Sequence, residues 1–359
     1  MIKIKTEALQ VATAKAVKGM GNLSILAITS SMGITVKDGD LTLSTTTNAM
    51  NLDVIVKDVA DKAASMYVCT DGNLFGKLVA KTTTDFIELE QTENSLRFTG
   101  DGVYNLPLIQ DEEGNMARIT DIKVESNEAY TVSAQDLKKL LTYNKLAVSK
   151  SYDQPIYTGY CVKDNHIYTF NDVTACISSV DLKNISALLP APMVDLFNLF
   201  EDKTVTVSIQ GNSIKFSSAD VTITGALLEG LSYYPADAIA QLANSADFKN
   251  TVKISKPKLS AALDRLSLFI DKTDKNKITV TFGENNLIIT NNASSAGEQL
   301  DYTEKSITES KIYPVDLQDL KGVVDASPVD IITILFGHDN GICIEDGNMR
   351  YIVPMLDEE

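Results

Sequence analysis

The feature that most constrains this chain is an internal repeat. A helix-like segment returns three times with the same spacing of apolar residues, at residues 4–16, 132–146 and 254–268. Each copy begins with a β-branched residue typical of a strand and continues with apolar residues three to four positions apart. The copies start 128 and 122 residues apart, so three similar units would fill the 359-residue chain.

The second half of each unit repeats as well. An alternating apolar, basic and aromatic pattern follows a polar turn, which is typical of a β-hairpin. The three copies of this pattern lie at residues 95–98, 213–216 and 348–351. A second short helix is predicted before each hairpin, at residues 72–84, 190–203 and 313–325.

These repeats predict an α+β fold of three similar domains. Polar stretches at the ends of the units place the domains at residues 1–125, 126–248 and 249–359. A helix with one apolar stripe packs on one face of an antiparallel sheet, so each domain should carry sheets on one side and two helices on the other. Repeated units that bury strand edges on one another can continue around a closed assembly.

Two segments resemble one known family. Residues 22–56 resemble the first-domain signature of the bacterial β sliding clamp, the β subunit of the replicative DNA polymerase, with Ser24 where that signature has proline. The closing segment MRYIVPML at residues 349–356 resembles the family's final strand, with one residue fewer. The acidic residues 357–359 are similar to the ending of eukaryotic and archaeal clamps. Together with the length and the threefold repeat, they make the chain resemble a divergent or virus-encoded clamp.

The resemblance implies a DNA polymerase processivity factor rather than an enzyme. Two chains would form a homodimeric ring of six domains, with helices lining a hole and sheets outside. The ring would encircle duplex DNA in the cytoplasm, slide without reading sequence, and tether the polymerase, the clamp loader and repair proteins. Such a ring needs no cofactor or metal. It would close head to tail through one edge near Phe75 and Leu78 and another near residues 278–287 or Tyr302.

The net charge of −16 first argues against DNA binding, because phosphate contacts need clustered lysine and arginine. Read by element, however, the charge separates. The predicted helices at residues 5–20, 133–150 and 255–272 carry 11 basic and 4 acidic residues, a net charge of +7. The three short helices carry −2, which leaves −21 for the remainder of the chain. That segregation fits a mildly basic hole inside an acidic ring.

Helical periodicity turns a set of basic side chains away from the predicted sheets. We therefore expect DNA to meet Lys15, Lys18, Lys77, Lys81, Lys138, Lys139, Lys145 and Arg265. Taken singly, each of these could equally be an ordinary solvated side chain. The short helices of the second and third units are acidic, which departs from a uniformly basic lining.

A partner pocket is implied by the resemblance alone. In the family, a short apolar peptide docks between the second and third domains, and the matching positions here are Tyr157, Leu317, Ile342, Ile352, Pro354 and Met355. These could equally be core residues of the last hairpin. The segment at residues 168–176 lacks the family's Gly-His-Arg, Lys275 falls near a family phenylalanine, and Tyr233-Tyr234-Pro235 replaces a Phe-Pro-Asp-Tyr segment. We therefore predict altered peptide specificity.

Other classes of protein fit less well. The chain has no P-loop, no GxGxxG after a strand, and no HExxH or GxSxG motif. Its four cysteines lack CxxC spacing, and it has only two histidines. No run of 18 apolar residues or apolar leader is present, so we expect no membrane contact. The remaining alternative is an acidic, repeat-built ring or scaffold that binds proteins but not DNA.

Overall fold

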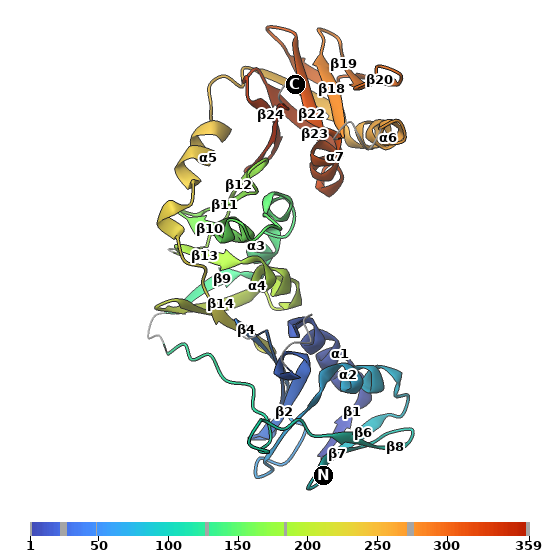
Figure 1. Cartoon of the computed structure of the whole chain (residues 1–359), viewed down its shortest axis with the longest axis vertical. Coiled ribbons are helices and arrows are strands. Elements are labelled where there is room, and N and C mark those ends of the chain that lie inside the picture. Colours follow the sequence, from blue (N-terminus) through green and yellow to red (C-terminus); the bar gives the residue numbers. More distant parts are fainter. Residues whose placement is uncertain are drawn as a thin grey trace. The chain divides into compact units, whose positions relative to one another are not determined.

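The computed structural model describes residues 2–21, 27–47, 49–125, 129–182, 185–270 and 276–356. The chain forms two compact units, and the middle one of the three predicted domains contributes to both (Figure 1). Unit 1 comprises Met1–Ala134 and Asp195–Leu227, and unit 2 comprises Gln135–Val194 and Leu228–Glu359. Among the described residues, no helix is long and apolar enough to span a membrane. The start of the family resemblance at residues 22–26, Lys275 and the tail 357–359 lie outside the described residues.

Unit 1 contains two antiparallel sheets. The larger sheet has eight strands in the order β5 (Met66–Asp71), β2 (Ser31–Lys37), β3 (Asp40–Thr46), β4 (Met50–Val56), β16 (Val221–Ala226), β15 (Ser213–Ser217), β14 (Thr204–Gln210) and β9 (Ala129–Ser133). The smaller sheet has the order β1 (Ile2–Lys5), β6 (Phe86–Gln91), β7 (Ser95–Thr99) and β8 (Val103–Pro107). The helical segments of the unit are α1 (Thr6–Ala16), η1 (Val17–Gly19), η2 (Ala27–Ser30), α2 (Gly72–Lys81) and η5 (Leu196–Leu199).

Unit 2 repeats this plan. Its larger sheet has nine strands in the order β13 (Ala187–Pro190), β10 (Gly159–Lys163), β11 (His166–Phe170), β12 (Ala175–Ser179), β25 (Met349–Pro354), β24 (Gly341–Asp346), β23 (Ile331–Phe336), β17 (Asn250–Ser255) and β21 (Glu304–Ser306). The smaller sheet has the order β20 (Gly297–Asp301), β19 (Asn286–Asn291), β18 (Lys277–Phe282) and β22 (Lys311–Asp316). Its helical segments are α3 (Ala134–Lys139), η3 (Asn144–Ala147), η4 (Pro155–Thr158), α4 (Ala191–Asp195), η6 (Leu231–Tyr233), α5 (Ala236–Ala243), α6 (Lys256–Ser267) and α7 (Leu317–Ala326).

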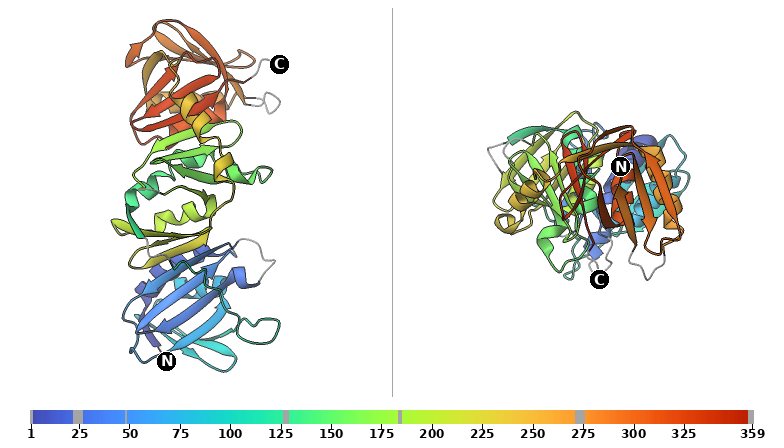
Figure 2. Two further views of the ribbon diagram at one scale, coloured as in Figure 1. Left: turned by 90° about the vertical axis from the view of Figure 1, so that its left-hand side faces the viewer. Right: turned by 90° about the horizontal axis from the view of Figure 1, so that it is seen from above.

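The threefold repeat and the α+β fold class are confirmed. In each copy the first helix directly follows a strand, as β1–α1, β9–α3 and β17–α6. The second helix does the same, as β5–α2, β13–α4 and β22–α7. The predicted hairpins are also present as β6–β7, β14–β15 and β24–β25. The left view of Figure 2 looks onto the strands of unit 1, and in unit 2 it shows α5 in front of the sheet, on the side away from α6 and α7 (Figure 1).

The large sheets arise where strands of successive copies pair at their edges. Strand β4 pairs with β16, placing Leu52 opposite Ile223, and β12 pairs with β25, placing Ala175 opposite Ile352. Both pairings cover strand edges that would otherwise expose unpaired N–H and C=O groups. The pattern of strand burial follows from the alternating sequence, since β18 buries Ile278, Val280 and Phe282.

Several sequence-based expectations about elements were wrong. The helix predicted over 133–150 ends at Lys139 and continues as turns, because Asn144 is buried with its amide within 3.4 Å of the Ile167 carbonyl and accepts from Ser178 Oγ at 2.7 Å. These tertiary hydrogen bonds compete with a continuous α-helix. Helix α5 was not expected at all. It follows Pro235 and buries Ala236, Ile239 and Ala243 on one face.

The residues expected near the ring-closing edges lie mostly on a helix or on inner strands. Phe75 and Leu78 lie on helix α2, whereas the free edge strand beside this region is β8. In the third copy, residues 278–287 belong to the inner strands β18 and β19 and their turn, and the edge strand is β20. Tyr302 comes directly after β20, so only that part of the expectation lies at an edge.

Candidate DNA-facing helices and partner pocket

Helix α1 turns an apolar face toward the sheets and the opposite face toward solvent. Leu9, Ala12 and Ala16 are buried, as the helical periodicity predicted, while Val11 and, on the following η1, Lys18 are exposed. The apolar spacing of three and four residues accounts for this division. Lys18 therefore lies where a DNA-facing cation was expected.

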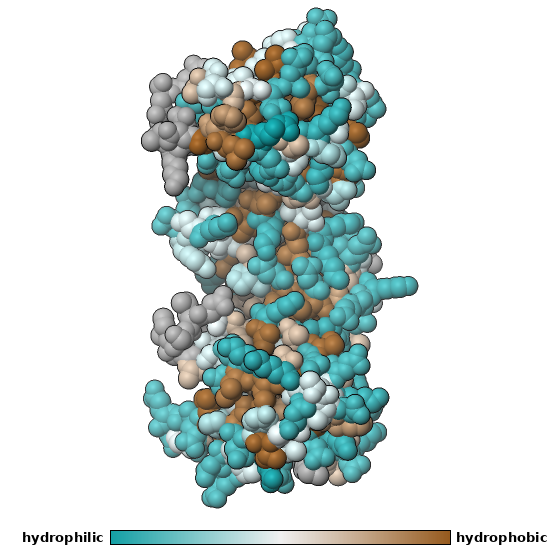
Figure 3. Space-filling model, turned by 90° about the vertical axis from the view of Figure 1, so that its right-hand side faces the viewer, coloured by the Kyte–Doolittle hydropathy of each residue, from teal (hydrophilic) through white to brown (hydrophobic). Residues whose placement is uncertain are grey.

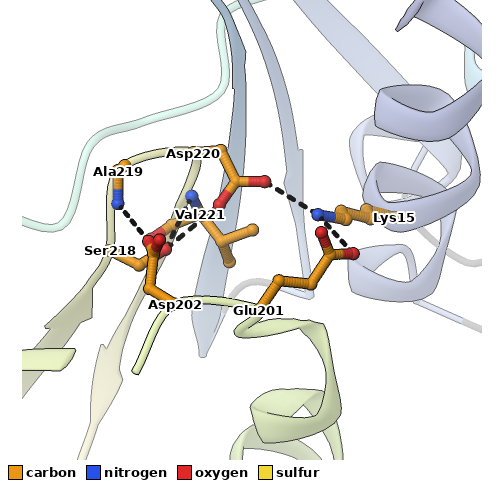
Figure 4. A network of polar contacts seen from close by, with 7 residues as sticks. All are labelled: Lys15, Glu201, Asp202, Ser218, Ala219, Asp220 and Val221. Carbon is orange, nitrogen blue, oxygen red and sulfur yellow. Dashed lines mark hydrogen bonds and ion pairs between the residues drawn. The ribbon is translucent and has the colours of Figure 1, made fainter. Parts of the chain in front are cut away.

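Lys15 does not. Its predicted position on the exposed face is wrong, since only 8% of the residue is accessible. Its ammonium donates to Asp220 Oδ2 at 2.7 Å and lies 3.0 Å from Glu201 Oε1 (Figure 4). Burial alone would lower the pKa of Lys15, but the hydrogen bonds to these two carboxylates outweigh it and raise the pKa above its ordinary value.

The carboxylates that hold Lys15 belong to the second copy of the repeat. Asp220 lies in the turn between β15 and β16, where Ser218 Oγ donates to its Oδ1 at 3.2 Å. The backbone N–H of Ala219 donates to Asp202 at 2.9 Å, which fixes the same turn (Figure 4). Lys15 thus joins the first copy to the second inside unit 1, and its ammonium is committed to protein carboxylates.

Helix α2 packs antiparallel to α1 and carries two exposed cations. The side chain of Asp71 caps the helix by accepting from the Leu74 N–H at 2.8 Å. Phe75 and Val79 are buried, while Lys77 and Lys81 are exposed one turn apart. These two lysines occupy the positions that the sequence predicted.

The predicted cations of the second copy are a mixed group. Lys138 is half-buried, and Lys139 is exposed and paired with Asp136 at 2.7 Å. Lys145 is exposed on η3 and also interacts with another group. The neighbouring Tyr143 donates to Asp346 at 2.5 Å, and burial is the main cause that raises the pKa of its hydroxyl.

In the third copy, Arg265 on α6 and Lys321 on α7 are paired with acidic groups. The Arg265 guanidinium binds Glu298 through two hydrogen bonds of 2.7 Å, which lower the pKa of that carboxyl. Lys321 on α7 contacts Asp264 at 2.9 Å and also pairs with Asp325. The side of unit 2 that bears α6 and α7 is therefore cross-linked by its own charges.

The predicted pocket residues fall into two groups. Leu317, Ile342 and Ile352 are buried, the first two in the core of the third copy. They can support the floor of a pocket but expose almost no surface. Tyr157 and Pro354 are partly exposed and Met355 is exposed, so these are the positions that a partner could reach.

An aromatic group lies beside Tyr157. Its ring meets Phe170 edge-on at 5.1 Å and Tyr234 at 5.8 Å between ring centroids. Val173, in the turn between β11 and β12, is half exposed. Phe170 and Val173 were missed by the sequence reading, although both lie in the segment whose difference from the family pattern was noticed.

The described residues were also compared with the requirements of a metal site and of a reactive thiol. In that part of the chain no cluster of three or more histidine, cysteine or acidic side chains could hold a metal ion. The four cysteines are buried free thiols, and burial raises the pKa of Cys69 to about 11. The helix-bearing side shows hydrophilic side chains interspersed with apolar surface (Figure 3).

Comparison with known proteins gives a fold but no close relative. No family model matches the chain, and no curated protein does either. Among solved structures, the DNA polymerase sliding clamp from Bacillus subtilis matches with a TM-score of 0.86 and 15% identity, over 100% of this chain and 99% of that one. The β subunit of DNA polymerase from Streptococcus pyogenes matches with a TM-score of 0.86 and 16% identity, over 99% and 100%. That of DNA polymerase III from Thermotoga maritima matches with a TM-score of 0.83 and 15% identity, over 100% and 99%.

Proposed function

We propose that this chain, which has the fold of bacterial DNA polymerase III β sliding clamps, is a DNA polymerase processivity factor. Two copies would form a ring around duplex DNA in the cytoplasm and tether a polymerase, a loader and other replication proteins, without enzymatic activity. The observation that carries the proposal is the likeness in fold over 99–100% of this chain to structures named as DNA polymerase sliding clamps. A partial match would fit many functions, whereas here all three copies of the repeat correspond.

The distribution of charge supports an interaction with DNA. The chain carries −16 overall, yet exposed cations gather on its helices, including Lys18, Lys77 and Lys81. Diffuse attraction to phosphates permits sliding, whereas an acidic exterior repels other stretches of DNA. Lys15 is excluded from the proposed contacts because Asp220 and Glu201 occupy its ammonium.

Two unpaired edge strands offer a way to close the ring. Strand β8 ends the small sheet of unit 1 and exposes Val103 and Tyr104. Strand β20 ends the small sheet of unit 2, and Leu268 and Phe269 are exposed just after α6, which packs against it. Edge strands with exposed apolar residues pair readily with another chain. We propose that β8 of one chain pairs with β20 of the other at both junctions of a homodimer.

The partner site would be the surface around Tyr157, Pro354 and Met355, supported from below by Leu317, Ile342 and Ile352. An exposed methionine adapts to apolar peptides of varied shape, and Met355 would supply that flexibility. A short apolar segment of a polymerase or loader is the proposed occupant.

The function is tested by topology. Dimers would be separated by dilution, re-formed by concentration with nicked circular DNA, isolated with that DNA, and then treated with a restriction enzyme. A clamp should remain on the circle and leave after linearisation, because it is held by its closed shape. Equal retention on both forms, or none on the circle, would contradict the proposal. Binding of proteins without any DNA retention would favour the acidic scaffold instead.

Ring closure has its own check. Replacing Leu268 and Phe269 with aspartate should yield a monomer of 39.0 kDa in sedimentation experiments and abolish retention on circular DNA. A wild-type chain that sediments only as a monomer at micromolar concentration would contradict a stable ring.

A further inference from the structure

We propose that the DNA-holding charge of this chain is concentrated on one helix pair, and we name Lys18, Lys77 and Lys81 the α1–α2 patch. Of the other predicted contacts, Lys139 and Arg265 are paired with carboxylates of the chain itself, Lys138 is half-buried, and Lys145 takes part in another interaction. This inference rests on the proposed function, since it assumes that duplex DNA is the ligand. It differs from a uniformly basic lining, in which all three copies would contribute alike.

The packing of α1 against α2 brings the patch together. The Gln10 amide on α1 donates to the carbonyls of Val79 and Thr82 at 3.1 and 3.0 Å, which fixes the antiparallel arrangement. Nearer the other end, a Cβ built on Gly76 would lie 3.0 Å from Val17 Cγ1. This approach is closer than most Cβ contacts, so a side chain at residue 76 would require Val17 Cγ1 to shift. Lys18 and Lys77 are the residues that directly follow this crossing point.

The patch is exposed and its cations are available. Within the residues that the structure describes, Lys18, Lys77 and Lys81 make no ion pair with a carboxylate. Helix α2 contains no acidic residue, and Asp71 at its start is engaged with the Leu74 N–H. Each of these ammonium groups can therefore neutralise a phosphate and release a counterion without first breaking a contact.

The remaining cations are in a different state. Lys139 is held by Asp136, Arg265 by Glu298 through two hydrogen bonds, and Lys321 by Asp264 and Asp325. A phosphate that approached one of these groups would have to displace a carboxylate and would meet its negative charge. Such pairs contribute little net attraction to DNA. On the helices of the second and third copies, Lys138 and Lys258 also make no ion pair within the described residues, and the second copy exposes Lys150 and Lys203 outside its helices.

The difference can be measured as a salt dependence. The logarithm of a DNA binding constant falls with the logarithm of salt concentration by about 0.9 for each phosphate neutralised. Loss of the three patch cations should therefore make the slope shallower by about 2.7. Loss of three cations that are already paired should change it by less than about 1.

The experiment uses the full-length chain and a short fluorescent DNA duplex, with binding followed by anisotropy over a range of salt concentrations. The patch variant carries Lys18→Gln, Lys77→Gln and Lys81→Gln. The paired variant carries Lys139→Gln, Arg265→Gln and Lys321→Gln. A third variant, with Lys37→Gln, Lys62→Gln and Lys203→Gln, removes the same charge from exposed positions outside the helices that make no ion pair within the described residues, and it controls for net charge. Circular dichroism and thermal melting verify that all three variants are folded.

We expect that only the patch variant will show a salt dependence of DNA binding with a shallower slope than that of the control variant. A paired variant that loses as much slope as the patch variant would overturn the inference, and so would a wild-type chain that does not bind the duplex at low salt. The topological assay separates the two proposals. If the wild type stays on nicked circles while the patch and paired variants show equal slopes, the processivity function stands and the concentration of charge on α1–α2 fails.

Discussion

The first and third copies of the repeat solve one packing problem in two ways. Both place two helices on antiparallel sheets in the same order, yet Gly76 of α2 lies close to Thr13 and Val17 in the first copy, whereas α6 buries Leu259, Leu263 and Leu266 in the third. Thr13 on α1 and Leu263 on α6 occupy corresponding positions of the repeat, and both are buried. The comparison teaches that the repeat preserves the spacing of buried positions while volume and polarity change freely.

The same two helix pairs differ in charge. The cations of α1–α2 other than Lys15 are free of carboxylates in the described residues, whereas Arg265 and Lys321 on α6–α7 are paired. A helix pair whose cations are bound by its own carboxylates is suited to holding a domain together. A helix pair whose cations remain exposed is suited to attracting phosphate. Under the proposed function, the first copy would contribute more to DNA binding than the third.

The largest effect should follow from shortening Leu263. Its side chain is fully buried in the core of the third copy, so Leu263→Ala should lower the free energy of unfolding of unit 2 by about 3 kcal/mol through lost burial and a cavity. Urea denaturation measures the change. Lys258→Ala, at an exposed site on the same helix, should leave the midpoint nearly unchanged. A cost below about 1 kcal/mol for Leu263→Ala would mean that the large-residue packing of α6 is not what stabilises this copy.

A pH-dependent effect is expected at Asp319 on α7. Burial first, and then the nearby Asp316, raise the pKa of its carboxyl to about 6. Because the folded pKa lies above the unfolded value, this group favours folding at low pH, and that contribution is lost as the pH rises from about 4 through 6. Asp319→Asn should therefore stabilise unit 2 by roughly 1–2 kcal/mol at pH 8 and hardly at pH 4.

Thermal melting of both proteins across this pH range tests the assignment. The groups that face Asp319 are Asp316, whose carboxylate accepts from the Gln318 and Asp319 N–H groups, and Tyr351 on β25. An equal gain at pH 4 and pH 8 would show that the effect comes from packing rather than from titration.

A smaller gain in stability, which comes from an unpaired hydroxyl rather than from a charge, is expected in α1. The Thr13 hydroxyl is buried and has no hydrogen-bond partner among the described residues. Thr13→Val replaces it with a methyl group of similar size and should stabilise unit 1 by about 1 kcal/mol. Thr45→Val is the matched control, since the Thr45 hydroxyl is equally buried but donates to the Ala16 carbonyl at 3.0 Å. That variant should be destabilised, and a loss of stability in both would show that Thr13 is paired after all.

The buried leucines of the repeat and Lys15 show what could and what could not be predicted from the sequence. The spacing of Leu9, Leu137 and Leu259 is a local property; it placed the start of the first helix of each copy correctly, and all three leucines are buried. The partner of Lys15 is Asp220, 205 residues away, and no local pattern encodes that meeting. Burial of a cation at the border of an apolar face depends on what the neighbouring copy presents there.

The partner pocket was harder to predict for a similar reason. Leu317 and Ile352 are apolar in either case, and composition cannot decide whether such a residue lies in a core or lines a surface. That distinction depends on the depth of each strand below the surface, which is a property of the whole fold. Only Met355, just after the last paired strand residue, is placed at the surface by its position in the chain.

The smallest effect compares the glycines of the two second helices. Gly322 on α7 has open space where a Cβ would be built, so Gly322→Ala should stabilise unit 2 by about 0.5–1 kcal/mol, because alanine loses less conformational entropy in a helix. Gly76 on α2 offers only 3.0 Å to Val17 Cγ1, and the contact opposes the same gain. Gly76→Ala should therefore stabilise unit 1 less, or destabilise it, and should shift the spacing of α1 and α2. Equal stabilisation by both substitutions would mean that the close crossing beside Lys18 and Lys77 yields easily, and the contrast between the two helix pairs would then lie in charge alone.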